Sequence, residues 1–248
     1  MKTILITGAT AGFGEAAARK FVGGGWRAIG TGRRGDRLTR LQDELADAFL
    51  PLEIDMRDRD ALESLARLEA PWGEIDLLLN NAGLAPPTDP LPDTDWDRIE
   101  TVIDTNVTGL VALTRALLPK LIERRGQIIN LSSVAATYPY KGGAVYAGTK
   151  AFVRQFSLDL RCDLLGTKVR VTSLEPGMCD TEFSLVRFKG DQSAAGKVYA
   201  GMKPLSADDV ALLVEQVLRL PPHININTLE VMPVQQAWSP FAVSREGS

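Results

Sequence analysis

Histidine and cysteine are scarce in this chain. Its 248 residues include one histidine, His223, and two cysteines, Cys162 and Cys179. A single histidine excludes a multi-histidine metal site, and the two cysteines fit neither a disulfide framework nor a zinc pattern. We therefore expect no metal and two reduced thiols, as in a cytosolic protein. His223 follows two prolines in a turn-like stretch, so we expect a structural or exposed side chain.

Long apolar runs and an excess of one charge are also missing. No run approaches the ~20 residues that span a bilayer. The start of the chain passes from a short apolar run straight into glycines, without the apolar core of a signal peptide. With 28 basic and 31 acidic residues the net charge is −3, which gives no electrostatic reason to bind nucleic acid or an anionic membrane. We expect a cytoplasmic protein without either partner.

Short apolar runs alternate with longer helical patterns along the whole chain. Several runs are apolar on both faces, which is typical of strands buried in a parallel sheet. The alternation predicts an α/β fold, a Rossmann-like doubly wound parallel sheet of about seven strands flanked by helices, in a single domain over 1–248. We predict strands at 3–6, 27–31, 50–54, 77–80, 127–131, 168–174 and 228–232. Among the helical segments are 14–22, 37–48, 59–68, 96–122 and 146–164. Two long irregular stretches, 82–94 and 176–204, are candidates for functional loops.

A glycine-rich loop follows the first predicted strand. Gly8 allows a tight turn, Gly12 lets backbone approach a pyrophosphate, and Gly14 allows close packing of the next helix. The free N–H groups of that helix then face the phosphates. An ordinary glycine-rich turn is the alternative. We expect a dinucleotide to bind here, with Thr10 and Phe13 in the same site.

Two arginines follow the second predicted strand. A carboxylate at that strand end would bind the adenosine ribose of NAD, but the chain has Arg33 and Arg34 there. Guanidinium groups suit the 2′-phosphate of NADP, so we prefer NADP(H) as the cofactor. The alternatives are a solvated basic turn or an arginine stacked on adenine. Asp55, after the third strand, is a candidate for the adenine edge or else a helix N-cap.

Further motifs occur in a fixed order at the predicted strand ends. They are Thr-Gly-x-x-x-Gly-x-Gly at 7–14, Asn-Asn-Ala-Gly at 80–83, Asn-x-x-Gly from Asn106 to Gly109, Ser133, Tyr-x-x-x-Lys from Tyr146 to Lys150, and Pro176-Gly177 with Thr181 beyond. Each is weak alone. Together they resemble the short-chain dehydrogenase/reductase family over essentially the whole chain.

Tyr146 and Lys150 have a chemical interpretation of their own. Positions i and i+4 share one helix face, so the ammonium can reach the phenol. A nearby positive charge lowers a phenol pKa from ~10 toward working pH, which suits a general acid/base. An unremarkable helix face is the alternative.

The resemblance implies roles for the other motif residues. Lys150 also binds the nicotinamide ribose, Ser133 stabilises the substrate oxygen, and Asn106 holds a water in a proton relay to Lys150. The alternative interpretation of Ser133 is a turn residue at the strand end, and the adjacent Ser132 is a rival for the same role. The alternative interpretation of Asn106 is a structural hydrogen bond inside a long helix. The alternative interpretation of Thr181 is a helix N-cap. We expect no catalytic thiol at Cys179. The remaining predicted cofactor contacts are Asn81, Ala82 and Gly83 on the ribose side, and Pro176, Gly177 and Thr181 beside the nicotinamide.

The substrate is expected to be a small acid. Arg187 or Lys189 can clamp a carboxylate, with a solvated loop or a subunit contact as the alternative. The segments 7–14, 32–34, 150–157, 186–191 and 224–233 resemble the bacterial NADP-dependent 3-hydroxy acid dehydrogenases. That subgroup oxidises short 3-hydroxy acids, serine or allo-threonine, or reduces the matching semialdehyde. The segment 178–180 is one residue shorter here, so the acid stays open.

The sequence is also compatible with other functions. The alternatives are an NADPH-dependent reductase of sulfoacetaldehyde or a neutral ketone, and a catalytically silent dinucleotide-sensing protein. The apolar tail around Trp238, Pro240 and Phe241, within about 233–248, resembles the family's subunit contact and implies a homotetramer. Docking of the tail onto the chain's own core is the alternative.

Overall fold

The fold is built on one seven-stranded parallel sheet. The computed structural model describes residues 1–86, 88–180, 182, 199, 201–237 and 242–243. The strand order is β3-β2-β1-β4-β5-β6-β7, and every neighbouring pair is parallel, which confirms the predicted fold class. The strands are β1 (Thr3–Thr7), β2 (Arg27–Gly32), β3 (Phe49–Glu53), β4 (Ile75–Asn80), β5 (Gln127–Leu131), β6 (Arg170–Pro176) and β7 (Thr228–Val231).

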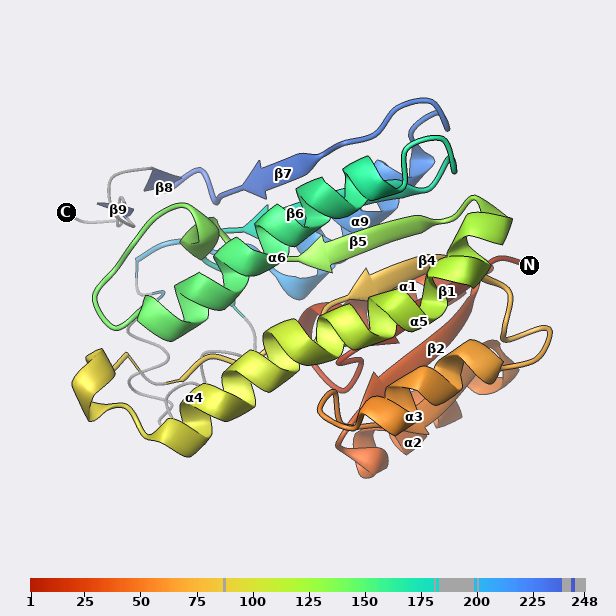
Figure 1. Cartoon of the computed structure of the whole chain (residues 1–248), viewed down its shortest axis with the longest axis horizontal. Coiled ribbons are helices and arrows are strands. Elements are labelled where there is room, and N and C mark those ends of the chain that lie inside the picture. Colours follow the sequence, from red (N-terminus) through yellow and green to blue (C-terminus); the bar gives the residue numbers. More distant parts are fainter. Residues whose placement is uncertain (87, 181, 183–198, 200, 238–241, 244–248) are drawn as a thin grey trace.

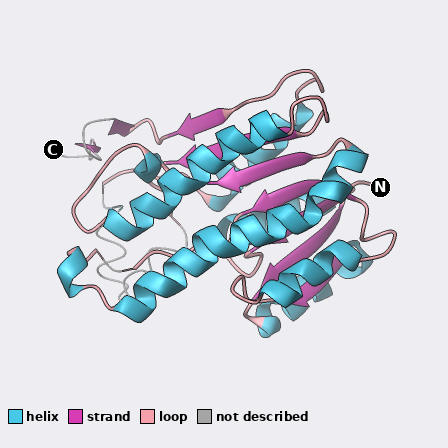
Figure 2. Ribbon diagram, in the orientation of Figure 1, coloured by secondary structure: helices cyan, strands magenta, loops and turns pink. Residues whose placement is uncertain are grey.

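Helices cover both faces of this sheet (Figures 1 and 2). They are α1 (Gly12–Gly23), α2 (Gly35–Leu45), α3 (Arg59–Ser64), α4 (Trp96–Ile103), α5 (Gly109–Arg124), α6 (Ala144–Asp163) and α9 (Ala207–Arg219). One buried cluster joins Ile4 and Ile6 to α1, α2 and α9, and the other joins Leu5 to α3, α5 and α6. Successive side chains of β1 thus enter opposite layers, which is why its run is apolar throughout.

The chain changes direction across the sheet between β1 and β4. From β1 it moves outward to β2 and β3, and then returns to β4 on the other side of β1. In open parallel sheets this reversal leaves a crevice outside the carboxyl ends of the two strands. The glycine-rich loop follows β1 and the Asn-Asn-Ala-Gly segment follows β4, so both motifs meet at that crevice.

Several element boundaries differ from the sequence prediction. The strand expected from 168 begins at Arg170, because Lys168 has a left-handed φ of 69° that a strand does not accommodate. The strand expected at 50–54 lies one residue earlier, at Phe49–Glu53. The helix expected over 96–122 is two helices joined by a π-helical turn at Asp104–Thr108, in which the N–H of Gly109 bonds to the carbonyl of Asp104.

Helix α9 was absent from the predicted segments, although it carries a clear start signal. Ser206 and Asp209 form a capping box, in which each side chain accepts a backbone N–H of the other residue. The C-terminal segment adds a short antiparallel pair, β8 (Gln236–Ala237) and β9 (Ala242–Val243).

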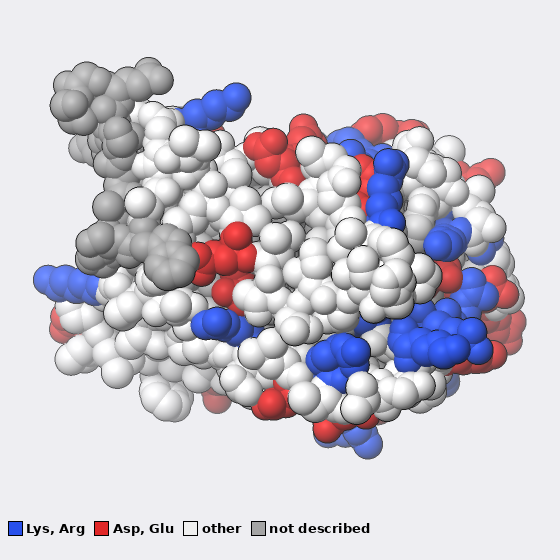
Figure 3. All heavy atoms as spheres, turned by 90° about the horizontal axis from the view of Figure 1, so that it is seen from above, with Lys and Arg blue, Asp and Glu red and all other residues white. Residues whose placement is uncertain are grey.

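Charged groups are mixed on the surface seen in Figure 3. Basic and acidic side chains lie among one another toward one end of that face. Among the described residues, no helix has the length and apolarity needed to cross a membrane.

Candidate active site

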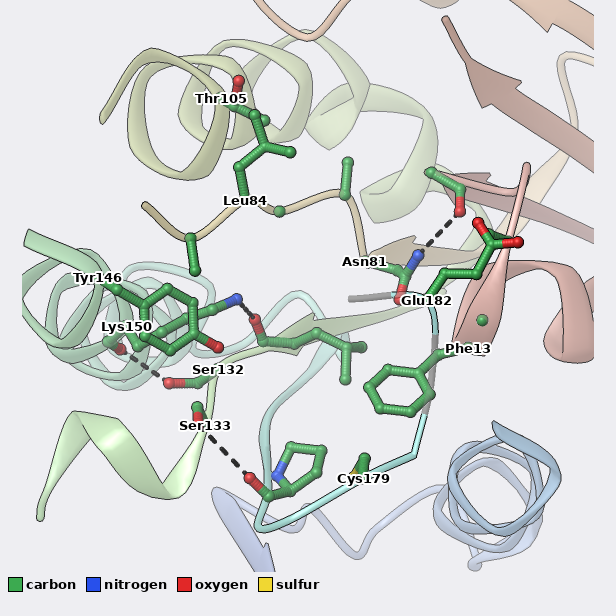
Figure 4. A pocket seen from close by; sticks show the side chains of 18 of the residues that line it. Phe13, Asn81, Leu84, Thr105, Ser132, Ser133, Tyr146, Lys150, Cys179 and Glu182 are labelled. Atoms are coloured by element: carbon green, nitrogen blue, oxygen red, sulfur yellow. Dashed lines mark hydrogen bonds between the residues drawn. The ribbon is translucent and has the colours of Figure 1, made fainter. Parts of the chain in front are cut away.

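A cavity of about 790 Å³ lies at the carboxyl ends of the strands. Figure 4 shows Tyr146, Lys150, Ser132 and Ser133 grouped at one part of it, and Phe13 and Glu182 at another. The predicted site residues that line it are Gly8, Thr10, Gly12, Phe13, Arg33, Arg34, Asp55, Asn81, Ala82, Gly83, Ser133, Tyr146, Lys150, Pro176 and Gly177. The lining omits Gly14 and Asn106. The predicted positions Thr181, Arg187, Lys189, Trp238, Pro240 and Phe241 lie outside the described residues.

The glycine loop has the geometry that its sequence predicts. Gly8 and Gly12 have φ values of 70° and 55°, in the left-handed region that favours glycine. A Cβ on Gly14 would lie 2.3 Å from the carbonyl oxygen of Gly8, so only glycine allows the helix to approach the loop this closely. Helix α1 has Ala11 at its N-cap and no side-chain cap, which leaves its first N–H groups available to a phosphate.

The loops after β1 and β4 are tied together by two side chains. The Thr7 hydroxyl accepts hydrogen bonds from the N–H groups of Asn81 (3.0 Å) and Ala82 (2.9 Å). The Asn81 amide donates to the carbonyls of Thr7 (2.8 Å) and Gly8 (3.2 Å). Asn81 therefore shapes the glycine loop from the side, besides lining the cavity.

The basic cluster after β2 is larger than the sequence analysis anticipated. Arg34 donates to the Thr10 hydroxyl at 2.8 and 3.0 Å and pairs with Glu182 at 3.1 Å. Arg37, one turn further along α2, pairs with Glu182 at 2.6 Å. Burial opposes ionisation of Glu182, but its hydrogen bonds from Arg37 and Arg34 lower its pKa overall. Arg33 is exposed and makes no ion pair among the residues placed here.

Asp55 has a local partner. Its carboxylate pairs with Arg57 at 2.7 Å and also accepts the Arg57 N–H, which lowers its pKa. The suggestion that Asp55 caps a helix is wrong, because the N-cap of α3 is Asp58, whose side chain accepts from Ala61. Asp55 still lines the cavity, so its contact with adenine stays a prediction.

Lys150 and Tyr146 are both buried on α6. Lys150 is 5% exposed and donates to the Leu131 carbonyl at 2.6 Å, where β5 ends. Its ammonium lies 5.7 Å from the centre of the Tyr146 ring. Burial lowers the pKa of Lys150 to about 8, because the charged form loses its water. No ion pair to Lys150 occurs among the described residues.

The two adjacent serines make different contacts. The Ser132 hydroxyl donates to the Lys150 carbonyl at 2.7 Å and holds α6 against the end of β5. The Ser133 hydroxyl accepts from the Ala135 N–H at 3.1 Å and lies 3.5 Å from the Pro176 carbonyl. The Ser132 hydroxyl therefore donates its hydrogen bond to the backbone of α6. The contacts of Ser133 lie instead on two residues that line the cavity, Ala135 and Pro176.

Asn106 lies behind the cavity, in the π-helical turn. Its amide oxygen accepts from the Leu84 N–H, and its nitrogen donates to the Leu84 carbonyl and the Thr149 hydroxyl, at 2.8 to 3.0 Å. The side chain therefore clamps the loop after β4. A Cβ on Gly83 would lie 3.4 Å from the Lys150 ammonium and 3.5 Å from the Asn106 amide oxygen. The proton-relay role of Asn106 stays a prediction.

Several lining residues were missed by the sequence analysis. Some are apolar or carry no motif, such as Leu84 and Thr105, so nothing local marked them. Arg37 does not line the cavity, but it pairs with the lining residue Glu182. It had a usable signal, because it lies three residues after Arg34 at the start of a helix. Cys179 also lines the cavity, and burial raises the pKa of its thiol to about 12, which keeps it protonated and unreactive.

Fold and cavity together define an α/β oxidoreductase of the nucleotide-binding type, with a glycine loop at the switch point and a buried tyrosine and lysine in the same cavity. The chain belongs to the short-chain dehydrogenase family, whose model matches residues 2–191. This confirms the resemblance seen in the sequence.

Individual relatives match over nearly their full length. The serine 3-dehydrogenase of Agrobacterium fabrum is 56% identical over 245 residues, which are 98% of each chain. The NADP-dependent 3-hydroxy acid dehydrogenase of Escherichia coli K12 is 52% identical over 246 residues, covering 98% of this chain and 99% of that one. A solved structure, the closed form of serine dehydrogenase complexed with NADP+, matches with a TM-score of 0.93 and 52% identity, covering 98% of this chain and all of that one.

Burial of Lys150 predicts how the stability of the nucleotide-free protein depends on pH. The folded-state pKa of about 8 lies below the usual 10.5, so between these values the unfolded state binds more protons and stability rises with pH. Relative to Lys150→Met, the wild-type protein should gain about 2 kcal/mol between pH 7 and pH 9.5. Urea unfolding at the two pH values measures the gain. An equal response of both proteins would show that Lys150 titrates normally.

Proposed function

We propose that this protein is an NADP-dependent oxidoreductase that transfers a hydride between nicotinamide and the 3-hydroxyl or carbonyl carbon of a small acid. The observation that carries the proposal is one cavity that joins a phosphate-type glycine loop and an arginine cluster to the buried pair Tyr146 and Lys150. A protein that only sensed dinucleotide would not need that pair together with Ser133.

The residues present fit a phosphorylated dinucleotide. The uncapped start of α1 and the left-handed glycines offer backbone N–H groups to the pyrophosphate. Arg33 and Arg34 would hold the 2′-phosphate, and Arg37, which shares the partner Glu182 with Arg34, adds a third guanidinium. Further contacts would come from Thr10, Phe13, Asp55, Asn81, Ala82, Gly83, Pro176, Gly177 and Thr181. The names of the relatives, which include NADP-dependent enzymes, support the same cofactor.

Tyr146 acts as the general acid/base in this proposal. It takes the proton of the substrate hydroxyl during oxidation and returns it to the carbonyl oxygen during reduction. The Lys150 ammonium favours the phenolate electrostatically, at 5.7 Å from the ring. Ser133 donates a hydrogen bond to the substrate oxygen, and Asn106 supports the proton path through Lys150. The bound nicotinamide supplies or accepts the hydride.

A small hydroxy acid is the substrate class that we favour. The relatives named above act on serine or on 3-hydroxy acids by their names, and both carry a carboxylate. We assign the carboxylate clamp to Arg187, with Lys189 as its neighbour. A reductase of sulfoacetaldehyde or of a neutral ketone is the second candidate, because the segment 178–180 differs in length from the subgroup's pattern.

We further propose a homotetramer that works in the cytoplasm. Large apolar side chains are exposed on α4 and α6, among them Trp96, Ile103 and Phe152. The two helices are in contact in the fold (Figure 1). Phe152 stacks on Phe156 on the same helix. Such an apolar surface favours contact with further copies of the chain. Free Cys162 and Cys179 fit a reducing compartment.

Replacing Tyr146 by Phe should lower kcat by roughly 10²- to 10⁴-fold, because the general acid/base is lost. NADPH binding, followed by its fluorescence, should persist. The adjacent serines give a matched comparison: Ser133→Ala should lower kcat by about 10²-fold or more, and Ser132→Ala only a few-fold. Undiminished turnover of Tyr146→Phe would remove this residue from the mechanism.

Replacing Arg34 by Ala should reduce the preference for NADP over NAD, measured as the ratio of their kcat/KM values. Loss of a charge-assisted contact with the 2′-phosphate corresponds to about 1.5–3 kcal/mol, or roughly 10- to 150-fold. Arg40→Ala is the control, because Arg40 lies on α2, the helix that follows Arg34, is exposed and pairs with Asp36. An unchanged ratio in Arg34→Ala and Arg33→Ala would place the 2′-phosphate elsewhere.

A panel assayed by NADPH absorbance at 340 nm in both directions tests the substrate class. It contains serine, allo-threonine, 3-hydroxypropionate and 3-hydroxyisobutyrate, together with succinic semialdehyde, sulfoacetaldehyde and a neutral ketone. Turnover should favour the acids, and Arg187→Ala should raise their KM roughly tenfold or more while the ketone is unaffected. Acid turnover that survives Arg187→Ala unchanged would discard the clamp.

A further inference from the structure

An ion pair between a buried carboxylate and a half-exposed guanidinium joins α6 to β6, outside the cavity. Glu175, on β6, is fully buried, and its carboxylate lies 3.4 Å from Nε of Arg154 on α6. The Ser173 hydroxyl donates to the same carboxylate oxygen at 2.8 Å. The cross-strand neighbour of Glu175 in the sheet is Glu230 on β7, so two carboxylates share this region with one guanidinium. None of these four side chains lines the cavity.

Stability gives no reason for this arrangement. Removing a carboxylate from water costs several kcal/mol, and apolar residues of similar volume are often at least as stable as a buried ion pair. The pair is also incompletely satisfied, because Oε2 of Glu175 and Nε of Arg154 have no hydrogen-bond partner among the described residues. The segments that the pair connects indicate a role other than stabilisation.

Arg154 connects two loops that flank Ser133. Its Nη1 donates to the Thr137 hydroxyl at 2.7 Å, four residues after Ser133 on the loop that follows β5. Its other contact, Glu175, is the residue before Pro176, and the Pro176 carbonyl lies 3.5 Å from the Ser133 hydroxyl. One guanidinium thus reaches both segments that contact Ser133.

Arg154 also belongs to the helix that carries the acid/base pair. Tyr146, Lys150 and Arg154 are spaced by four residues, so they follow one stripe of α6. A second tie joins the same loop to the sheet edge, because the Tyr138 hydroxyl donates to Glu230 at 3.3 Å. These contacts therefore run from the helix that carries Tyr146 to the loop that carries Ser133.

We propose that Arg154 and Glu175 are positioning residues for Ser133. They fix the positions of the loop after β5 and of the end of β6 relative to α6, so that the hydroxyls of Ser133 and Tyr146 can both hydrogen-bond to the same substrate oxygen. The inference rests on the proposed function. It adds a set of residues that touch neither substrate nor cofactor and still determine kcat, because a small misplacement of a catalytic group is costly.

The test measures kcat, KM, NADPH affinity and thermal unfolding of Arg154→Met, Arg154→Lys and Glu175→Gln. Arg154→Met and Glu175→Gln, which each remove one charge of the pair, should lower kcat about tenfold or more and change the NADPH affinity by no more than about twofold. Arg154→Lys, which keeps the charge, should restore part of the loss. The control is Arg170→Met, at the opposite end of β6, where Arg170 donates to the Leu218 and Leu220 carbonyls. That variant should lose stability without a selective loss of kcat.

A double-mutant cycle with Ser133 separates positioning from general support. In a Ser133→Ala background, Arg154→Met should cost little further kcat, because the group that it positions is gone. The same loss in both backgrounds would overturn the proposal, as would an unchanged kcat or losses that parallel NADPH affinity and unfolding temperature. If Arg154→Met does not fold, Arg154→Lys and Glu175→Gln complete the cycle. Full turnover of Ser133→Ala alone would instead reject the proposed function of Ser133.

Discussion

The site depends on a lysine ammonium held almost entirely out of water. Lys150 has the Leu131 carbonyl at 2.6 Å and the face of Tyr146 nearby, and burial shifts its pKa downward. Burying a charge is costly unless its surroundings are fixed in advance. The end of β5 and the helix α6 must therefore hold their relative position whether or not a ligand is bound.

A row of buried polar side chains secures that position. Asn80 on β4 donates to Asn130 on β5 at 2.8 Å and to Thr114 on α5 at 2.9 Å. Asn130 in turn donates to Ser157 on α6 at 2.9 Å. These bonds link two strands to the two helices that cover them. Because polar partners in a low-dielectric core must match in position, they fix the register of the helices more tightly than apolar packing alone.

Local chemistry explains why much of the fold and of the site was predictable. Strands apolar on both faces indicate a parallel sheet, the glycine loop needs its left-handed turn, and the spacing of Tyr146 and Lys150 places them on one helix face. Features formed by distant segments left no comparable signal. Glu182 meets Arg34 and Arg37 only through the tertiary fold, and Arg154 finds Glu175 in the same way. The π-helical turn at 104–108 also escaped, because its sequence continues a regular helical pattern.

The contact of Glu182 with Arg34 and Arg37 makes an internal carboxylate compete with any phosphate that binds these guanidiniums. A phosphate that arrives at these guanidiniums meets a carboxylate of the same chain, so binding there is an exchange of one anion for another. The observed affinity then reflects a difference between two sets of charge-assisted bonds, and it scales with the fraction of molecules in which the guanidiniums are free of the internal anion. Because Glu182 follows the end of β6 at Pro176 by six residues, the position of its carboxylate and the binding of an anion at Arg34 and Arg37 form one linked equilibrium.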